Sequence, residues 1–168
     1  MYRRVLSRGA YTGGLLVLTG VLAWVTGQPF VFPSLGPSAY LLATAPDAPA
    51  SQPRRVLGGH VLGVVAGLLA YWTLAPGLAI TADAAVLATG QFRLVLSGVV
   101  SVALTTAAML ATDTGHAPAC ATTLIVSLGL LAAPLQAAGI VVAVVVLAAT
   151  TRSHRECCSA ERGRTDEP

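Results

Sequence analysis

The sequence predicts an all-α integral membrane protein, with four full transmembrane helices and two shorter membrane segments broken by proline and glycine. The first observation is the composition: 55% of the 168 residues are hydrophobic and 10% are charged, whereas a typical soluble domain has about 25% charged residues. The second is the distribution of charge, because four stretches contain no Asp, Glu, Lys or Arg: residues 9–46, 56–82, 94–112 and 114–151. These features exclude an ordinary soluble domain, a disordered chain and, at a formal net charge of +3, a nucleic-acid-binding protein.

Six membrane segments follow from the lengths of these stretches. A helix needs about 20 apolar residues to cross a hydrocarbon core about 30 Å thick, so each of the two longest stretches holds two segments. We expect segments near residues 11–27, 30–45, 56–75, 94–112, 117–132 and 135–150. They form one polytopic membrane domain, over residues 1–151.

The first segment follows a group of basic residues, Arg3, Arg4 and Arg8, as the apolar region of a signal peptide would. No convincing small-x-small cleavage site comes after it, and several more apolar segments do. We therefore expect a first transmembrane helix that is retained in the protein.

The second and fifth segments are expected to be short and broken. Pro33, Gly36 and Pro37 interrupt the second, and Gly115 and Pro118 lie at the start of the fifth. Proline removes a backbone donor and clashes with the preceding turn, which leaves polar groups that are costly in lipid unless protein or water satisfies them. The backbone of both segments therefore belongs inside the bundle. Each segment either crosses the membrane or enters it and returns to the same side.

The third and fourth segments each carry a stripe of small or polar residues. Gly59, Gly63 and Gly67 recur every four residues on the third, which is typical of a face where two helices pack closely in lipid. Two other uses of this glycine face are open: space for a permeant, and contact with a second copy of the chain. On the fourth segment, hydroxyl side chains at the same spacing either bond to a neighbouring helix or face a pore. They are Ser97, Ser101 and Thr105.

The arginines predict the orientation, because cytoplasmic flanks collect Lys and Arg. Six crossings from a cytoplasmic N-terminus place Arg93 outside and all other arginines inside; these are Arg3, Arg4, Arg8, Arg54, Arg55, Arg152, Arg155, Arg162 and Arg164. Four crossings with two re-entrant segments would move Arg54 and Arg55 outside and Arg93 inside, which gives a slightly weaker bias. Both arrangements put both termini in the cytoplasm, where residues 152–168 form a polar tail that we expect to have no fold.

Each half of the chain follows the pattern of a helix, a broken helix and a second helix. An offset of 81 residues aligns Pro37 with Pro118 and Pro53 with Pro134. Three crossings in each half would make the second half inverted relative to the first, as in many transporters. The sequence therefore predicts a 3+3 internal repeat.

Ionisable side chains in or beside the membrane are candidates for function, because such groups are rare there. His60 lies about one turn inside the third segment, and it is either a neutral histidine bonded to the next helix or a group that handles substrate or protons. Asp113 and His116 open the fifth segment; either they pair with each other, or Asp113 caps the helix. These three residues and Cys120 lack metal-ligand spacing, so we expect no metal and no cofactor. No nucleophile and base share a fixed spacing either, so we expect no catalytic residues and no enzyme.

The two broken segments also predict a place for an anion. Each starts a helix after its proline-glycine interruption, near Ser38 in the second segment and near Ala119 in the fifth. The unpaired N–H groups and the positive end of the helix dipole favour an anion at such a start, most of all in a dry setting. Broken helices that meet near the middle of the membrane form the binding site in several transporter folds.

Two stretches carry a family resemblance. Residues 32–68, with Leu-Gly-Pro-Ser-Ala at 35–39 and Gln-Pro-Arg-Arg-Val-Leu-Gly-Gly-His at 52–60, closely resemble the first signature of the HPP family of small integral membrane proteins. The string His-Ala-Pro-Ala-Cys-Ala-Thr at 116–122 is similar to that family's His-Pro-Pro motif. The resemblance spans about residues 11–150. It implies an all-helical membrane protein, usually with four spanning helices, and nitrite transport by analogy with plastid and cyanobacterial relatives.

The residues and the resemblance together predict a transporter or channel for a small inorganic anion, with nitrite as the first candidate, embedded in a lipid bilayer. The expected substrate-binding residues are Gly36, Ser38, Arg54, Arg55, His60, Asp113, His116 and Pro118. Arg54 and Arg55 are expected to raise the anion concentration at the cytoplasmic mouth. We expect the protein in a prokaryotic cell membrane. The alternative is a structural or regulatory membrane subunit that transports nothing and acts through the glycine face or the tail.

Overall fold

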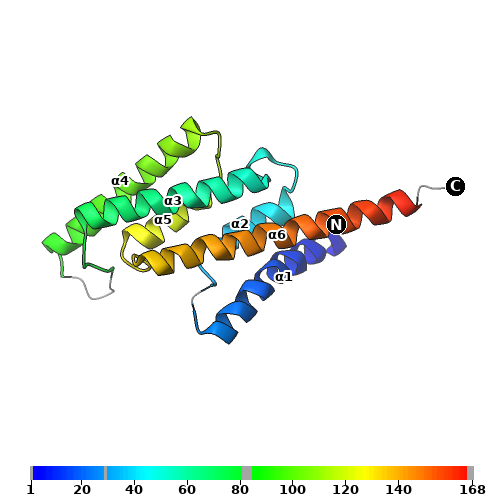
Figure 1. The fold of residues 1–168 in the computed structure, drawn as a ribbon, viewed down its shortest axis with the longest axis horizontal. Helices are drawn as coiled ribbons and strands as arrows, with labels where there is room; N and C mark the ends of the chain where they lie inside the picture. Colours follow the sequence, from blue (N-terminus) through cyan, green and yellow to red (C-terminus); the bar gives the residue numbers. More distant parts are fainter. Residues whose placement is uncertain (1, 29, 81–84, 166–168) are drawn as a thin grey trace.

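The computed structural model describes residues 2–28, 30–80 and 85–165, which form a bundle of α-helices (Figure 1). The elements are α1 (Tyr2–Thr26), α2 (Leu35–Thr44), the 3₁₀ turn η1 (Pro49–Ser51), α3 (Pro53–Leu74), α4 (Thr89–Ala111), α5 (Ala119–Ser127) and α6 (Pro134–Thr165). Four of the described helices contain a stretch long and apolar enough to cross a membrane: Val5–Thr26, Pro53–Leu74, Thr89–Ala111 and Pro134–Arg152. The predicted fold class, with four full helices and two short ones, is confirmed.

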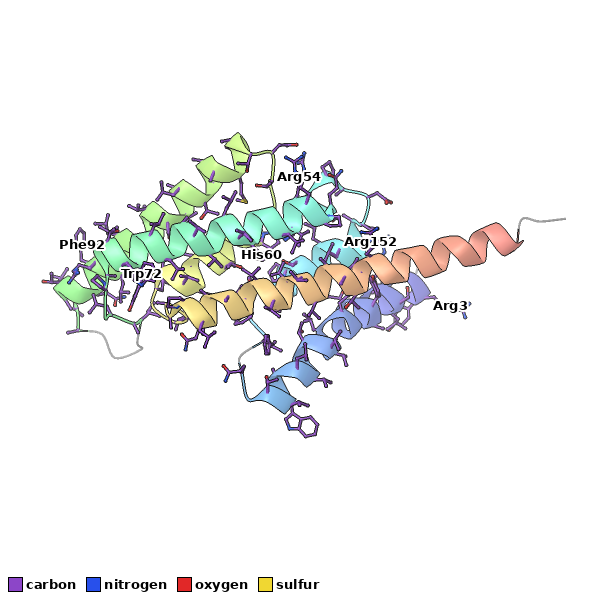
Figure 2. All side chains as sticks on the ribbon, in the orientation of Figure 1. Arg3, Arg54, His60, Trp72, Phe92 and Arg152 are labelled. Atoms are coloured by element: carbon purple, nitrogen blue, oxygen red, sulfur yellow. The ribbon has the colours of Figure 1, made fainter. Side chains whose placement is uncertain are left out.

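Contacts between distant residues define two ends of the bundle. At one end, which we call the arginine-rich end, Nη1 of Arg8 donates to the carbonyl oxygen of Thr44 at 2.7 Å. Figure 2 shows Arg3, Arg54 and Arg152 toward this end, and Trp72 and Phe92 toward the opposite one. The aromatic residues at the far end are typical of a membrane–water interface.

The broken segments both run from one end of the bundle to the other, which favours crossing over re-entry. The second starts at the far end, where Gln28 and Leu135 line one cavity, and finishes at Thr44 beside Arg8. The fifth leaves α4 at the arginine-rich end and finishes at Leu128, whose carbonyl oxygen accepts from the Ile80 N–H at 3.0 Å. The chain therefore makes six passes, four as full helices and two as an irregular stretch followed by a short helix.

The two short helices begin near the middle of the bundle because of their length. α2 has 10 residues and α5 has 9, which at 1.5 Å per residue gives about 15 Å and about 14 Å, or half of a hydrocarbon core. Membrane segments are expected over residues 30–45 and 117–132, with helices that start near Ser38 and near Ala119; the observed helices start at Leu35 and Ala119, so each is shorter than its segment. The difference has a local cause, since Pro33 and Pro118 exclude helix before them, and Gly129, with φ of +79°, ends α5.

The order of elements repeats. A long helix, an irregular stretch, a short helix and a second long helix occur as α1 to α3 and again as α4 to α6. Pro53 and Pro134, which the offset aligns, are the first residues of α3 and α6. α1 starts at the arginine-rich end and α4 at the opposite end, so the two halves run in opposite directions.

Helix α6 continues into the segment that was expected to have no fold. It reaches Thr165, and residues 152–165 therefore belong to a helix in the structure. The physical reason is that Ala, Glu and Arg favour helix, and no proline or glycine interrupts the chain between Gly139 and Gly163.

The glycine face of α3 packs on α5 of the same chain. A Cβ added at Gly63 would lie 2.8 Å from the carbonyl oxygen of Ala119 and 2.8 Å from Oγ1 of Thr123. At Gly67 the carbonyl oxygen of Thr123 would be 2.9 Å away. Only a residue without a side chain allows this approach of two backbones. The glycines therefore fix where α5 lies.

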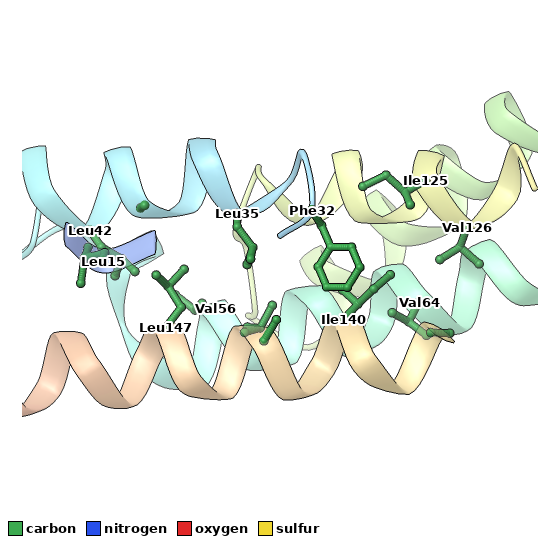
Figure 3. Close-up of a cluster of buried hydrophobic side chains, with 14 residues drawn as sticks. Leu15, Phe32, Leu35, Leu42, Val56, Val64, Ile125, Val126, Ile140 and Leu147 are labelled. Atoms are coloured by element: carbon green, nitrogen blue, oxygen red, sulfur yellow. The ribbon is translucent and has the colours of Figure 1, made fainter. Parts of the chain in front are cut away.

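A second contact region joins the two halves through α6. Figure 3 shows buried side chains of α1 and α2 packed with those of α6 and α3. The larger ones are Leu15, Phe32, Leu35, Val56, Ile140 and Leu147. The outer surface of α1 is also apolar, with Trp24 85% and Val17 60% exposed, as expected for side chains that face lipid.

The close approach at Gly63 predicts a stability effect. Gly63→Ala is expected to lower the stability of the protein in detergent by about 1–3 kcal/mol, because the added methyl group meets a helix backbone that cannot rotate away. The measurement is the midpoint of thermal unfolding. Gly139→Ala in α6 is the matched control, because no atom lies within 4 Å of its added Cβ and helix propensity alone favours alanine by about 1 kcal/mol. Equal midpoints for the two variants would contradict the prediction.

Candidate functional site

Three of the predicted binding residues meet in the interior of the bundle. Ser38 lies in the first turn of α2, His60 lies in the second turn of α3, and His116 lies just before α5. All three side chains are fully buried. The start of α2 and the residues just before α5, one from each half of the chain, therefore meet beside His60 of α3, which Figure 2 labels.

The hydroxyl group of Ser38 lies between the two imidazole rings. Its Oγ is 3.1 Å from Nε2 of His60 and 3.1 Å from Nε2 of His116. The ring centroids are 5.1 Å apart, and the rings are inclined by 56°. We call these three residues the His–Ser–His cluster.

The far nitrogen of each ring also has a partner. Nδ1 of His60 is 2.7 Å from Oγ1 of Thr122 on α5, and Nδ1 of His116 is 2.8 Å from the carbonyl oxygen of Ala50 in η1. A carbonyl oxygen only accepts hydrogen bonds, so Nδ1 of His116 is the donor in that bond. The cluster thus ties α2, α3, η1 and α5 together through buried polar atoms.

Local backbone structure places His116 against α3. The carbonyl oxygen of His116 accepts from the N–H of Ala119 at 2.9 Å, which closes the first turn of α5 around Pro118. A Cβ added at Gly59 would be 3.0 Å from Cβ of His116, and one at Gly58 would be 2.7 Å from Cγ2 of Thr114. The two adjacent glycines therefore make room for residues 114–116 beside α3.

Arg55 and Asp113 form an ion pair at the arginine-rich end, outside the cluster. Nη2 of Arg55 donates to both carboxylate oxygens of Asp113, at 2.7 and 2.8 Å. Asp113 has a left-handed backbone, with φ of 52°, at the turn that leaves α4, a conformation that aspartate adopts more readily than most residues. The expected alternatives, pairing with His116 and capping of α5, are both wrong, because this turn points the carboxylate away from the cluster.

The remaining predicted residues surround the cluster without contacting it. Nη2 of Arg54 lies 3.4 Å from the carbonyl oxygen of Thr112, so Arg54 binds the same turn as Arg55. Pro118 is buried as the residue before α5, and Gly36 lies in the first turn of α2 with no atom within 4 Å of an added Cβ. The binding set predicted from the sequence thus separates into an inner group and an outer group.

Sequence reasoning missed two members of the inner site. Thr122 lies six residues after His116 on the buried side of α5, and a polar pair, Thr122 and Thr123, within an apolar segment was the available signal. Ser34 precedes α2, and its Oγ is buried without a hydrogen-bond partner in the structure. A buried hydroxyl group without a partner is unusual, and it lies one turn before Ser38 at the start of α2.

The hydroxyl stripe of α4 bonds mainly to α5. Oγ of Ser97 donates to the carbonyl oxygen of Ser127 at 2.9 Å, and Oγ1 of Thr105 lies 2.7 Å from Oγ1 of Thr123. Ser101 donates to Gly98 of its own helix. In the part of the chain that the structure describes, no group of three or more His, Cys, Asp or Glu side chains is placed to hold a metal ion.

The comparisons with known proteins give one match. A family model described as "HPP, transmembrane region" matches residues 3–154. No curated protein and no solved structure shows significant similarity to the chain.

The position of Ser38 predicts a second stability effect. Ser38→Ala is expected to destabilise the protein by about 1–3 kcal/mol, because it leaves Nε2 of both histidines without a partner in a dry interior. Thermal unfolding in detergent measures the effect. Ser101→Ala is the control, since Ser101 is equally buried but bonds only within its own helix. The prediction fails if Ser38→Ala unfolds no earlier than Ser101→Ala.

Proposed function

Because the chain belongs to the HPP transmembrane family, we propose that it is a transporter or channel for a small inorganic anion, with nitrite as the first candidate. The family resemblance of its two signature stretches supports nitrite. The arrangement of the short helices supports the broader class, and it is the observation on which the proposal depends.

The short helices α2 and α5 aim their N-terminal turns at the same buried place from opposite directions. Each N-terminus carries about half a positive charge from the helix dipole, although the first N–H groups of α5 donate to the carbonyl oxygens of residues 116–118. Ser38 and His116 of these turns are in contact, so the two positive ends lie near each other. A small anion is the ligand that such an arrangement favours.

The arginine-rich end supplies an entrance of suitable charge. A cavity of about 220 Å³ lies at this end between α2, α3 and α6, and Ser51 and Arg152 are among its lining residues. Ser51 follows Ala50, the hydrogen-bond partner of His116. Basic groups at a mouth raise the local concentration of anions, so the entrance and the inner site suit the same class of substrate.

Flux through purified protein tests the proposal. In proteoliposomes, uptake of nitrite is compared with that of nitrate, formate and chloride, after subtraction of flux into protein-free vesicles. We expect selective nitrite flux for the unmodified protein. For His116→Ala we expect a loss of roughly ten- to hundred-fold, because a hydrogen bond to an ion contributes about 1.5–3 kcal/mol, with membrane abundance unchanged.

Two comparisons complete this experiment. His154→Ala, in the segment after Arg152, is the control and is expected to transport normally. Normal flux through His116→Ala would remove this histidine from the mechanism. No flux of any anion through folded protein would overturn the proposal and favour the membrane subunit that transports nothing; deletion of residues 152–168 would then abolish function if that subunit acts through its tail.

We also propose that the arginine-rich end, with both termini, faces the cytoplasm, because cytoplasmic flanks collect arginine. The test uses a variant with Cys120, Cys157 and Cys158 replaced by serine, and a single new cysteine. On intact cells, a membrane-impermeant maleimide is expected to label Val86→Cys, a position that is 92% exposed at the far end, and to leave Asp47→Cys unlabelled. The reverse pattern would invert the orientation.

A further inference from the structure

The His–Ser–His cluster has more hydrogen-bond contacts than hydrogens. The hydroxyl groups of Ser38 and Thr122 and the neutral imidazole rings of His60 and His116 supply one hydrogen each. These four hydrogens must serve five contacts. Three are made by Ser38, with the carbonyl oxygen of Ser34, with His60 and with His116. The other two join His60 to Thr122 and His116 to the carbonyl oxygen of Ala50. With both histidines neutral, one contact holds no hydrogen.

The carbonyl oxygen of Ala50 determines which contact is empty. Because Nδ1 of His116 donates to it, Nε2 of the neutral ring carries no hydrogen, while the hydroxyl group of Ser38 donates to the carbonyl oxygen of Ser34 at 3.0 Å. Oγ of Ser38 accepts from Nε2–H of His60, whose Nδ1 accepts from Thr122. The empty contact is therefore the one between Oγ of Ser38 and Nε2 of His116, although these two atoms are 3.1 Å apart.

One added proton fills all five contacts without moving a heavy atom. The proton bonds to Nε2 of His116, which becomes a donor to Oγ of Ser38. The hydroxyl group of Ser38 keeps its bond to the carbonyl oxygen of Ser34, and His60 keeps its bonds to Ser38 and Thr122. The result is an imidazolium ring at His116, with one positive charge.

The carboxylates of the surrounding elements, Asp47 in the loop before η1 and Asp113 in the turn before α5, are both exposed and lie outside the cluster. The charged groups at the start of α3 are Arg54 and Arg55, and the carboxylate of Asp113 already pairs with Arg55. The other titratable groups are Cys120 on α5 and Tyr40 on α2, while α4 after Arg93 and α6 before Arg152 carry none. The positive ends of α2 and α5 also disfavour a lone cation here. An anion bound at these helix ends would supply the missing charge.

We infer that the His–Ser–His cluster binds a proton together with the transported anion, so that the two cross the membrane as a neutral pair. This inference rests on the proposed function, because it names the ion coupled to anion transport at the same site. The proton is held at Nε2 of His116, and the anion lies beside it at the N-termini of α2 and α5. Each stabilises the other in a medium where an isolated charge is costly.

Calorimetry measures the coupled proton directly. Binding of sodium nitrite to the purified full-length protein is measured in two buffers with different ionisation enthalpies, and the difference gives the number of protons taken up per anion bound. Every protein in this experiment carries His154→Gln, so that His60 and His116 are the two histidines left in the chain. We expect uptake of about one proton per nitrite, and binding without proton uptake after His116→Gln, whose amide donates to Ala50 but cannot be protonated. Ser101→Ala serves as the control that keeps proton uptake.

Vesicles separate the failure of this inference from that of the proposed function. A nitrite gradient is imposed on proteoliposomes with a pH dye inside, and flux into protein-free vesicles is subtracted. Nitrite flux that acidifies the vesicle interior and generates no membrane potential supports the inference. Nitrite flux that generates a potential and leaves the internal pH unchanged overturns the inference while the proposed function stands. Absence of both binding and flux overturns both.

Discussion

The packing of the half-length helix α5 against α3 is the constraint on which the rest of the bundle depends. α2 and α5 begin inside the apolar layer, where polar backbone groups have no water to satisfy them. The polar backbone groups at the start of α5 are tolerated because α5 packs closely on α3. At Gly63 and Gly67 of α3, atoms of α5 occupy the place that a side chain would take. Thr114, His116 and Pro118, in the irregular stretch before α5, are thereby buried by protein.

The same packing creates the polar interior. Once α5 lies on the glycine face, His116 and Thr122 come within reach of α3, and His60 bonds to Thr122 at 2.7 Å. Ser38, from the other half of the chain, fills the space between the rings. A cluster of neutral groups that satisfies all but one of its contacts is cheaper in lipid than any charged group, so the interior has a stable resting state and a defined place for an added proton.

The two inverted halves supply chemically different side chains from corresponding positions, the start of α2 and the stretch before α5. The first turn of α2 supplies a hydroxyl group, which both donates and accepts, whereas the stretch before α5 supplies an imidazole ring, which can also be protonated. The broken segment in each half has the same mechanical cause, a proline and glycine interruption. The repeat therefore explains the symmetry of the backbone, and the side chains explain why the site itself is asymmetric.

Much of the fold was predictable from the sequence alone, since membrane spans depend on apolar length and the position of proline, both of which are local properties. The four full helices, the two broken segments and the glycine face of α3 follow from such patterns, and so does the choice of Ser38, His60 and His116 as candidates. The pairing of Arg55 with Asp113 did not follow, because residues 58 positions apart meet only through helix packing. Packing likewise decided that the broken segments run from one end of the bundle to the other, and it placed Ser38 between two rings that lie 22 and 78 residues away along the chain. Hydropathy carries no information on such contacts, since it measures how well each residue suits an apolar environment and not which other residue it contacts inside the bundle.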